Sequence, residues 1–286
     1  MTSDATTGQV ATAAADVYEE FFVPALFRTW VGPMCDAAVV DEGQRVLDVA
    51  CGTGVLARAA RERVGPRGAV EGVDRNAGML AVARRADPHV TWRLGRAEQL
   101  PCHDDAFDAT VSQFGLMFFE DKVKALQEMR RVTRPGGRVA VAVWGPLQET
   151  PGYAAMVELL DRLFGAEAAD ALRAPYCLGD QERLARLFRS AGYGEVDVAM
   201  RVGTARFPSI DDWVHTDVRG WTLAGTLSDG QYEQLRQAAH DRLAEFVQPD
   251  GTVRFAAPAY VVTAGAWCRP SARPGVAQGE SGSRGR

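Results

Sequence analysis

Two glycines and one carboxylate have the spacing in this chain that points most directly to chemistry. Gly52 and Gly54 lie in the stretch LDVACGTGVLARA, residues 47–59, between an apolar run and a segment with helical spacing, and Asp74 follows Gly54 by 20 residues. Glycines let a backbone approach a ligand, a helix N-terminus offers free N–H groups, and a carboxylate one strand further on accepts hydrogen bonds from ribose hydroxyls. The pattern predicts a site for a ribose-containing ligand, and NAD, FAD and S-adenosylmethionine all fit that description.

The elements that position this turn alternate between strand and helix. Segments rich in β-branched or aromatic residues predict strands at 45–50, 69–74, 90–94, 107–114 and 138–144. Helical spacing is found at 55–64, 76–86 and 121–132, where Pro135, Gly136 and Gly137 are expected to end the last helix. This alternation predicts a parallel sheet with ligands beyond the carboxyl ends of its strands.

Beyond Trp144 the alternation weakens. Helical patterns at 152–165, 180–192, 209–225 and 229–247 are interspersed with strand patterns at 195–203 and 252–266. We therefore expect an α/β, Rossmann-like, seven-stranded, mostly parallel sheet with an antiparallel edge strand, helices on both faces and a helical cap over the carboxyl ends. The expected division is a disordered tail at 1–15, a cofactor-binding core at 16–150, a cap with closing strands of the same domain at 151–267, and a disordered tail at 268–286.

Composition narrows the function classes. The net charge of -5, with acidic and basic residues interspersed, argues against a nucleic-acid partner. The five cysteines are far apart and form no Cys-x-x-Cys pair, which predicts reduced thiols and no metal site. No apolar run approaches the roughly 18 residues of a membrane span, and the N-terminus lacks a signal-peptide pattern. We expect a cytoplasmic protein whose oligomeric state the sequence leaves open.

Four motifs carry a resemblance to a known family. VLDVACGTG, GVDRNAGML, GRAEQLPCHDDAFDATVSQFGLMFFED and EMRRVTRPGGRVAVAVW occur in this order. They resemble the successive motifs of class I S-adenosylmethionine-dependent methyltransferases, especially the branch with the ubiquinone/menaquinone-biosynthesis C-methyltransferases (methyltransferase type 11 domain), over about residues 16 to 145. The resemblance implies an enzyme that moves the methyl group of S-adenosylmethionine to an O, N or C atom of a small, largely apolar acceptor by in-line displacement.

The same resemblance implies a set of cofactor-binding residues. Asp74 would bind the ribose hydroxyls, and Met79 would either pack on the adenine or belong to the core. Arg96 stands where many relatives have an acidic residue, which leaves the contact to the adenine amino group open. The full set is Tyr18, Asp48, Ala50, Gly52, Gly54, Asp74, Arg75, Met79, Ala97, Glu98, Gln113 and Phe114.

The acceptor and any general base are expected in the cap. His215 is the first candidate for a general base because it lies near Trp213, and His103 is the second; either is alternatively a surface residue. The candidate acceptor contacts are aromatic residues and one arginine, which pack on or orient a ligand, although the tryptophans are alternatively core. They are Tyr176, Trp213, Arg219 and Trp221.

Two other function classes stay open at this point. An NAD-dependent oxidoreductase shares the glycine turn, but the chain has no Tyr-x-x-x-Lys pair, and its only lysines are Lys122 and Lys124. A non-catalytic S-adenosylmethionine-binding module would keep the same cofactor residues. Methyl transfer to an acceptor is the observation that separates this module from an enzyme.

Overall fold

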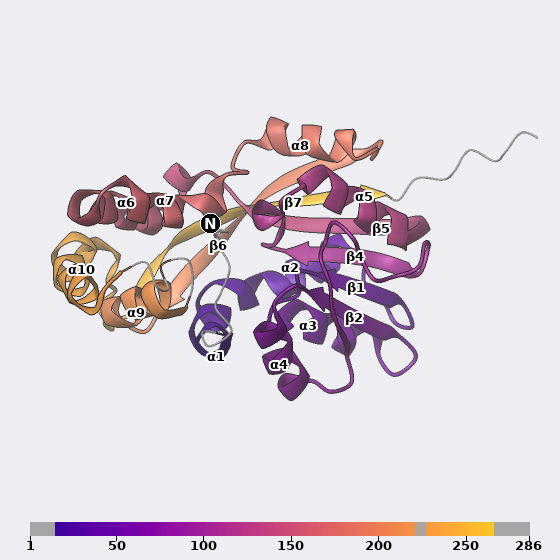
Figure 1. Ribbon diagram of the computed structural model, residues 1–286, viewed down its shortest axis with the longest axis horizontal. Helices are drawn as coiled ribbons and strands as arrows, with labels where there is room; N and C mark the ends of the chain where they lie inside the picture. The colour runs from indigo at the N-terminus through magenta and orange to yellow at the C-terminus, as the bar shows by residue number, and fades with distance from the viewer. Residues whose placement is uncertain (1–14, 221–222, 224–226, 266–286) are drawn as a thin grey trace, which may run out of the picture.

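The computed structural model describes residues 15–220, 223 and 227–265 of the 286-residue chain. In these ranges seven strands form one sheet in the order β3-β2-β1-β4-β5-β7-β6 (Figure 1). The expected tails, 1–15 and 268–286, lie outside the described residues except for Ala15. The strands are β1 Arg45–Val49, β2 Ala69–Asp74, β3 Thr91–Leu94, β4 Phe107–Gln113, β5 Thr133–Trp144, β6 Val196–Phe207 and β7 Val253–Gly265.

Helices cover the sheet and its carboxyl edge. Helices α2 and α3 contact each other and pack on β1, β2 and β5, whereas α5 and α8 contact each other and pack on β4, β5 and β6. Because both faces are covered, the middle strands are mostly buried, as Val46, Leu47 and Val49 of β1 illustrate. The helices are α1 Ala15–Val17, η2 Tyr18–Phe27, η3 Arg28–Trp30, α2 Val31–Ala37, α3 Val55–Val64, α4 Ala77–Ala86, η4 Leu116–Phe118, α5 Lys122–Val132, η5 Leu147–Glu149, α6 Pro151–Phe164, α7 Ala166–Arg173, η6 Ala174–Tyr176, α8 Gln181–Ser190, α9 Ile210–Gly220, α10 Asp229–Arg242 and η7 Ala244–Phe246.

The strand order reverses at β1, which fixes where a ligand binds. Strand β1 pairs in parallel with β2 on one side and with β4 on the other, and β5 continues the parallel set. Strand β7 is antiparallel to both β5 and β6. The predicted Rossmann-like architecture is thus confirmed. The antiparallel strand, β7, is the second strand from the edge, and β6 forms the edge itself. Ligands of such sheets bind where the carboxyl ends of β1 and β4 diverge.

The cap stands on a ribbon that projects past the parallel strands. Residues 253–258 of β7 pair with 202–207 of β6 beyond Trp144, the last residue of β5. Helices α6, α7, α9 and α10 gather around this ribbon, on the left in Figure 1. Phe255 packs against Trp213 with ring centroids 4.8 Å apart. Gly152, which has no side chain, lets α6 approach the Phe255 ring closely. The cap therefore lies past the carboxyl ends of the strands.

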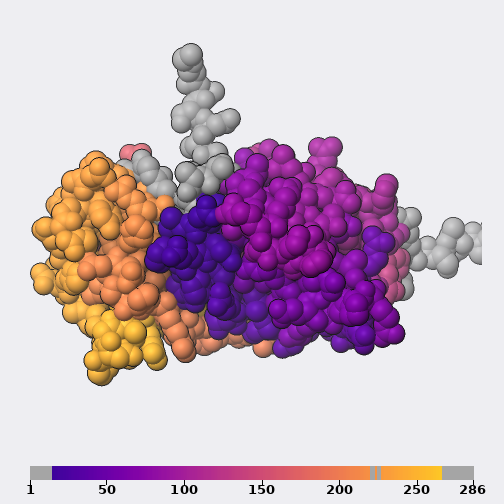
Figure 2. Space-filling model, turned by 90° about the horizontal axis from the view of Figure 1, so that it is seen from below, coloured from indigo at the N-terminus to yellow at the C-terminus, as the bar shows by residue number. Residues whose placement is uncertain are grey.

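The N-terminal helices lie between the cap and the core of the sheet. Figure 2 shows their indigo surface between the orange cap and the magenta core. Helix η2 contacts α9 and β6, and α1 contacts α4. Helix η2 is a π-helix that contains Pro24, which has no N–H to donate to the regular helical pattern. This segment places Tyr18 beside the carboxyl edge.

Several boundaries differ from those that the sequence predicts. Strand β5 begins at Thr133, directly after α5, so Pro135–Gly137 lie within the strand rather than in a separate loop. Strand β6 continues to Phe207, four residues past the predicted end, because it pairs with β7 along its whole length. Helix α7, over 166–173, was not expected from the sequence. The extension of β6 thus comes from pairing with β7, a segment that is distant in sequence.

Candidate functional site

The turn after β1 takes a backbone conformation that suits a close ligand contact. Ala50, Gly52 and Gly54 have φ angles of 57°, 55° and 87°, in the left-handed region. A Cβ atom on Gly54 would stand 2.2 Å from the Trp92 ring. Glycine is therefore required at position 54 both by the backbone conformation and by packing. Helix α3 starts directly after this residue and directs its N-terminus to the site.

Asp74, at the carboxyl end of β2, is held rigidly beside this turn. Its Oδ2 accepts a hydrogen bond of 2.8 Å from the N–H of Gly52, and its Oδ1 accepts one of 2.8 Å from the N–H of Asn76. Burial raises the pKa of the Asp74 carboxyl, and these two hydrogen bonds oppose the shift. Each carboxylate oxygen keeps a further lone pair with which to accept a ligand hydroxyl.

Asp48, one residue before the end of β1, is a second buried carboxylate. Burial raises the pKa of Asp48 well above its ordinary value, although a hydrogen bond from the backbone of Ala57 lowers it. Its Oδ2 has no hydrogen-bond partner within the described residues. Asp48 lines a small recess together with Gly52 and Thr53. A buried acceptor without a partner costs free energy, which a ligand donor would recover.

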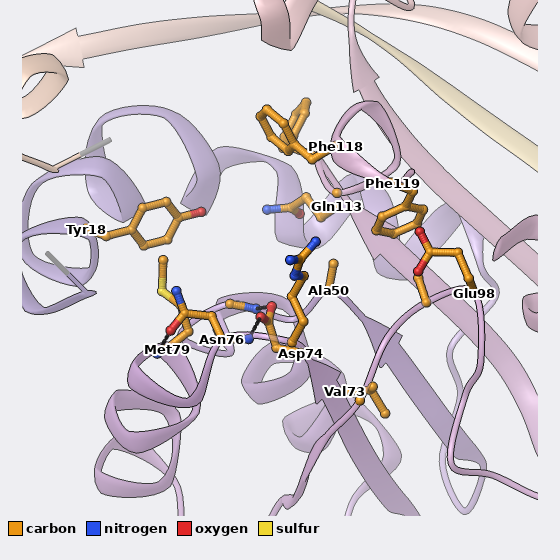
Figure 3. A pocket seen from close by; sticks show the side chains of 16 residues that line it. Tyr18, Ala50, Val73, Asp74, Asn76, Met79, Glu98, Gln113, Phe118 and Phe119 are labelled. Carbon is orange, nitrogen blue, oxygen red and sulfur yellow. Dashed lines mark hydrogen bonds between the residues drawn. The ribbon is translucent and has the colours of Figure 1, made fainter. Parts of the chain in front are cut away.

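A cavity opens over these residues at the carboxyl edge of the sheet (Figure 3). The open space in and directly above it, which is continuous with solvent, measures about 830 Å³. Most of the expected cofactor residues contribute to the described lining. The lining residues are Tyr18, Ala50, Gly52, Val73, Asp74, Arg75, Asn76, Met79, Gly95, Ala97, Glu98, Gln113, Phe114, Gly115, Phe118 and Phe119.

One end of the cavity is formed by Tyr18, Gln113 and Phe114. Tyr18 and Gln113 point toward each other across the top of the cavity in Figure 3. The Gln113 Nε2 donates to the Phe27 carbonyl over 3.2 Å, while its Oε1 has no partner in the described chain. Burial and the nearby carboxylates raise the pKa of Tyr18, so its hydroxyl stays protonated. Phe114 takes a positive φ of 57° and stacks on Trp144 with centroids 3.8 Å apart.

An ion-pair network closes the opposite rim. Arg96 contacts Glu120 at 2.7 Å and Glu98 at 3.5 Å, and Arg75 contacts Glu120 at 3.4 Å. Glu98 also accepts from the N–H of Glu120 over 2.9 Å. Glu98 therefore ties the loop after β3 to the loop after β4, while its side chain lines the cavity.

The predicted cap residues do not join this cavity in the described part of the chain. His215 lies against Phe21, with ring centroids 5.7 Å apart. Trp213 is 0% exposed and stacks on Phe207, a core position. Arg219 pairs with Asp229 and lies 4.9 Å from the Tyr232 ring centroid.

Tyr176 and Trp221 complete the predicted acceptor contacts. Tyr176 is half-buried against Trp144, with ring centroids 6.4 Å apart. Trp221 lies outside the described residues. The acceptor roles of all these residues remain predictions.

Residues that sequence reasoning missed include Asn76, Phe118 and Phe119. The Asn76 side chain accepts from the N–H groups of Gly78 and Met79 and so starts helix α4. An asparagine directly after Asp74 and before a helical pattern was a usable signal. Phe118 and Phe119 follow β4 in the quoted motif, but only the fold directs them to the cavity.

A buried carboxyl in the cap predicts a pH-dependent stability. Asp217 is 0% exposed, and burial raises its pKa to about 8, although Tyr153 and Trp213 lower it. Because the folded-state pKa exceeds the unfolded one, its contribution to stability is complete below about pH 3.9 and is lost as pH rises through 8. Between pH 6 and 7.5 the wild type should lose about 1 to 2 kcal/mol relative to Asp217→Asn.

Urea unfolding of both proteins at several pH values measures this difference. An Asp229→Asn variant, altered at an exposed carboxylate that pairs with Arg219, should follow the wild type in this interval. A constant gap between wild type and Asp217→Asn would contradict the prediction.

The described residues include neither a helix that could span a membrane nor a group of side chains that could hold a metal ion. They contain no helix that is long and apolar enough to cross a membrane. In the same ranges, no three or more His, Cys, Asp or Glu side chains are grouped so that they could hold a metal ion.

Comparisons with known proteins agree with the motif resemblance. The model of the ubiE/COQ5 methyltransferase family matches residues 10–153. The demethylmenaquinone methyltransferase of Halalkalibacterium halodurans is 47% identical over 105 residues, which make up 35% of this chain and 43% of that relative. The ubiquinone/menaquinone biosynthesis C-methyltransferase UbiE of Chromobacterium violaceum is 35% identical over 198 residues, 64% of this chain and 80% of the relative.

A solved structure shows the same fold. Phosphoethanolamine N-methyltransferase 2 of Haemonchus contortus, in complex with phosphomonomethylethanolamine and S-adenosylhomocysteine, gives a TM-score of 0.57 at 19% identity. The superposition covers 89% of this chain and 57% of that one.

Proposed function

The chain belongs to the ubiE/COQ5 methyltransferase family, and on this premise we propose that it methylates a small, largely apolar metabolite such as a quinol, phenol or polyketide. It is an S-adenosylmethionine-dependent methyltransferase. The curated relatives are named for demethylmenaquinone and for ubiquinone and menaquinone biosynthesis, which supports a ring-containing acceptor. The family match does not favour the NAD-dependent oxidoreductase or the non-catalytic module.

The observation that carries the residue assignment is the carboxylate of Asp74. It lies beside the Gly52 turn, fixed by two backbone amides, with lone pairs left for the two hydroxyls of a ribose. The buried and unpartnered Asp48 Oδ2 suits a cationic amino group at the other end of the ligand. The cavity between them and its glycine-lined floor fit S-adenosylmethionine. Met79, Ala97 and Glu98 would border the adenine.

The remaining residues exclude water and orient the reactants. When bound, the cofactor supplies a methyl group that is already activated by a positively charged sulfur. Tyr18 and Gln113 would flank the methyl-bearing sulfur of the cofactor, and Phe114 would form the apolar wall of the cavity beside it. Positioning and exclusion of water are the main contributions that such a site makes to the rate, up to roughly 7 to 11 kcal/mol.

The N-terminal helix keeps Tyr18 over the site. Arg58 on α3 donates to Glu19 over 2.7 Å and to the Thr53 carbonyl over 2.8 Å. Arg58 therefore joins Glu19, the residue next to Tyr18, to Thr53 in the glycine turn. Because the helix also contacts the cap, Tyr18 would stand between the cofactor and the acceptor.

Methyl transfer from deuterium-labelled S-adenosylmethionine tests the proposal. The purified chain is incubated with naphthoquinols, alkyl phenols and enolic polyketides, and the products are analysed by mass spectrometry. We expect one ring-containing class to gain a labelled methyl group. This product should disappear in the Asp74→Ala variant but persist in Asp87→Ala, which removes a carboxylate that accepts a hydrogen bond from the N–H of His89. Binding of S-adenosylhomocysteine with no transfer to any small acceptor would overturn the proposed acceptor class. Tight binding of NAD with none of S-adenosylhomocysteine would overturn the cofactor assignment.

A further inference from the structure

The outer edge of the sheet is open along one stretch of β6. This strand is the last in the sheet, and within the described residues it pairs with β7 alone. The side chains of Met200 and Val202 on it are 40% and 77% exposed. An edge strand with exposed apolar side chains offers unpaired N–H and C=O groups and an apolar surface to another strand. The residues of this stretch indicate which strand complements it.

The backbone of this stretch directs its hydrogen-bonding groups outward at every second residue. Val202 lies opposite Pro258 of β7, which has no N–H, and the Pro258 carbonyl accepts from the first residue after β5 over 2.9 Å. Val202 therefore faces away from β7, and so do Met200 and Val198, because an antiparallel ladder alternates with a period of two residues. The side-chain amide of Gln181 donates to the outward Val198 carbonyl over 3.2 Å, which agrees with this direction.

The other face of the same stretch carries one acidic and one basic side chain. Asp197 and Arg201 are both exposed, and neither has an ion-pair partner among the residues that the structure describes. They are four residues apart on a strand, about 13 Å, which is too far for a pair within one chain. They are placed symmetrically on either side of Ala199. A symmetric arrangement of opposite charges is what self-pairing of a strand requires.

Two copies of β6 that run antiparallel about a two-fold axis at Ala199 are complementary in charge. Asp197 of each copy then lies directly opposite Arg201 of the other, which gives two ion pairs for each pair of strands. These positions do not exchange backbone hydrogen bonds, so their side chains approach each other closely. A register centred two residues further on, at Arg201, would set this cation opposite itself. The charges therefore favour the register at Ala199.

The apolar face is complementary in the same register. Val198 lies opposite Met200 of the second copy, and Val196 lies opposite Val202, so the two most exposed apolar side chains of the strand are covered. These are the residues whose N–H and C=O groups face outward, and they form the new ladder. The Val198 carbonyl keeps a second lone pair beside the one that accepts from Gln181.

We propose that β6 is a dimerisation strand, through which two copies of this chain join edge to edge into one continuous sheet. The paired Asp197 and Arg201 side chains fix the register, and the apolar face supplies contact area. The inference goes beyond the proposed function, because it uses no residue of the cofactor cavity. It names a second copy of the chain as the partner that fits this surface.

Light scattering of the full chain at several concentrations tests this surface. We expect the mass of the wild type to rise with concentration toward twice the 30.9 kDa of one chain. Asp197→Arg sets cations opposite each other and Arg201→Asp sets carboxylates opposite each other, so each should raise the dissociation constant of the dimer at least tenfold. The double variant Asp197→Arg/Arg201→Asp should restore the affinity of the wild type within threefold.

A mixture of the two single variants provides a second readout. An edge with two cations then faces an edge with two carboxylates, so the mixture should form a 1:1 heterodimer although each variant alone stays mostly monomeric. Arg206→Asp is the matched control. It makes the same change of charge at an exposed position of β6 beyond the paired stretch, and it should keep the affinity of the wild type.

Several results would overturn the proposal. A wild type that stays monomeric at every concentration would show that this edge does not bind a second copy. A dimer that keeps its dissociation constant in both single variants, or single variants that do not associate when mixed, would exclude this register. An equal loss in Arg206→Asp and Arg201→Asp would assign the effect to net charge instead of to the pairs. Circular dichroism checks that each variant is folded.

Discussion

An Asp74→Ala variant is expected to bind S-adenosylhomocysteine at least about a hundredfold more weakly than the wild type. Each hydrogen bond to a charged acceptor contributes about 1.5 to 3 kcal/mol, and the variant loses two ribose contacts of this kind. The substitution also frees the N–H groups of Gly52 and Asn76, which the carboxylate holds at 2.8 Å. The turn therefore loses its anchor together with the ligand contacts.

Isothermal titration calorimetry of the wild type and the variant measures this loss. Asp87→Ala is the matched control, because Asp87 is a carboxylate at the end of α4 whose side chain accepts a hydrogen bond from the N–H of His89. We expect the control to keep the affinity of the wild type. An affinity within threefold of wild type in Asp74→Ala would exclude Asp74 from the cofactor site.

A Gly54→Ala variant is expected to be destabilised by about 2 to 5 kcal/mol, combining a left-handed backbone with overpacking. The φ angle of Gly54 is 87°, and the new Cβ would stand 2.2 Å from the Trp92 ring. Trp92 is itself fixed, since its Nε1 donates to the Asp87 carbonyl over 2.8 Å. The ring therefore cannot move away without losing a hydrogen bond. The melting temperature should fall by roughly 5 to 15 °C.

A variant of a second glycine separates the backbone cost from the cost of the contact with Trp92. Gly136 has a φ of 80° with open space around its Cβ position, so Gly136→Ala measures the backbone cost alone. We expect thermal unfolding to show a clearly smaller loss for Gly136→Ala than for Gly54→Ala. Equal losses would mean that the Trp92 contact adds nothing and that the turn adapts to a side chain.

The sequence predicts the cofactor half of the molecule closely because its signals are local. The strand at 69–74 and the helix at 55–64 are found at the predicted residues. Their apolar periodicity and the glycine turn before the helix act within one or two turns of chain. Nearly all of the expected cofactor residues line the cavity or its recess, because the carboxyl ends of parallel strands meet at one edge.

The cap is less predictable because its arrangement depends on distant partners. Trp213 and His215 are two residues apart, so the helix turns them to opposite sides, Trp213 to the core of the cap and His215 to Phe21. The sequence pattern does not say which side faces an acceptor. The burial of Asp217 is not predictable from the sequence, since an aspartate in an amphipathic helix is usually exposed to solvent.

The sequence by itself determined the fold class, the family and the carboxylate that we propose binds the ribose, because motif order and spacing are properties of the chain alone. The tertiary structure decided how the cap is assembled. It extends β6 and β7 beyond Trp144 so that four helices pack there, and it buries Asp217 against Tyr153, 64 residues away in sequence. Burial of a charge depends on every element packed around it, so only the assembled cap reveals that this carboxyl group is buried and that its pKa is raised.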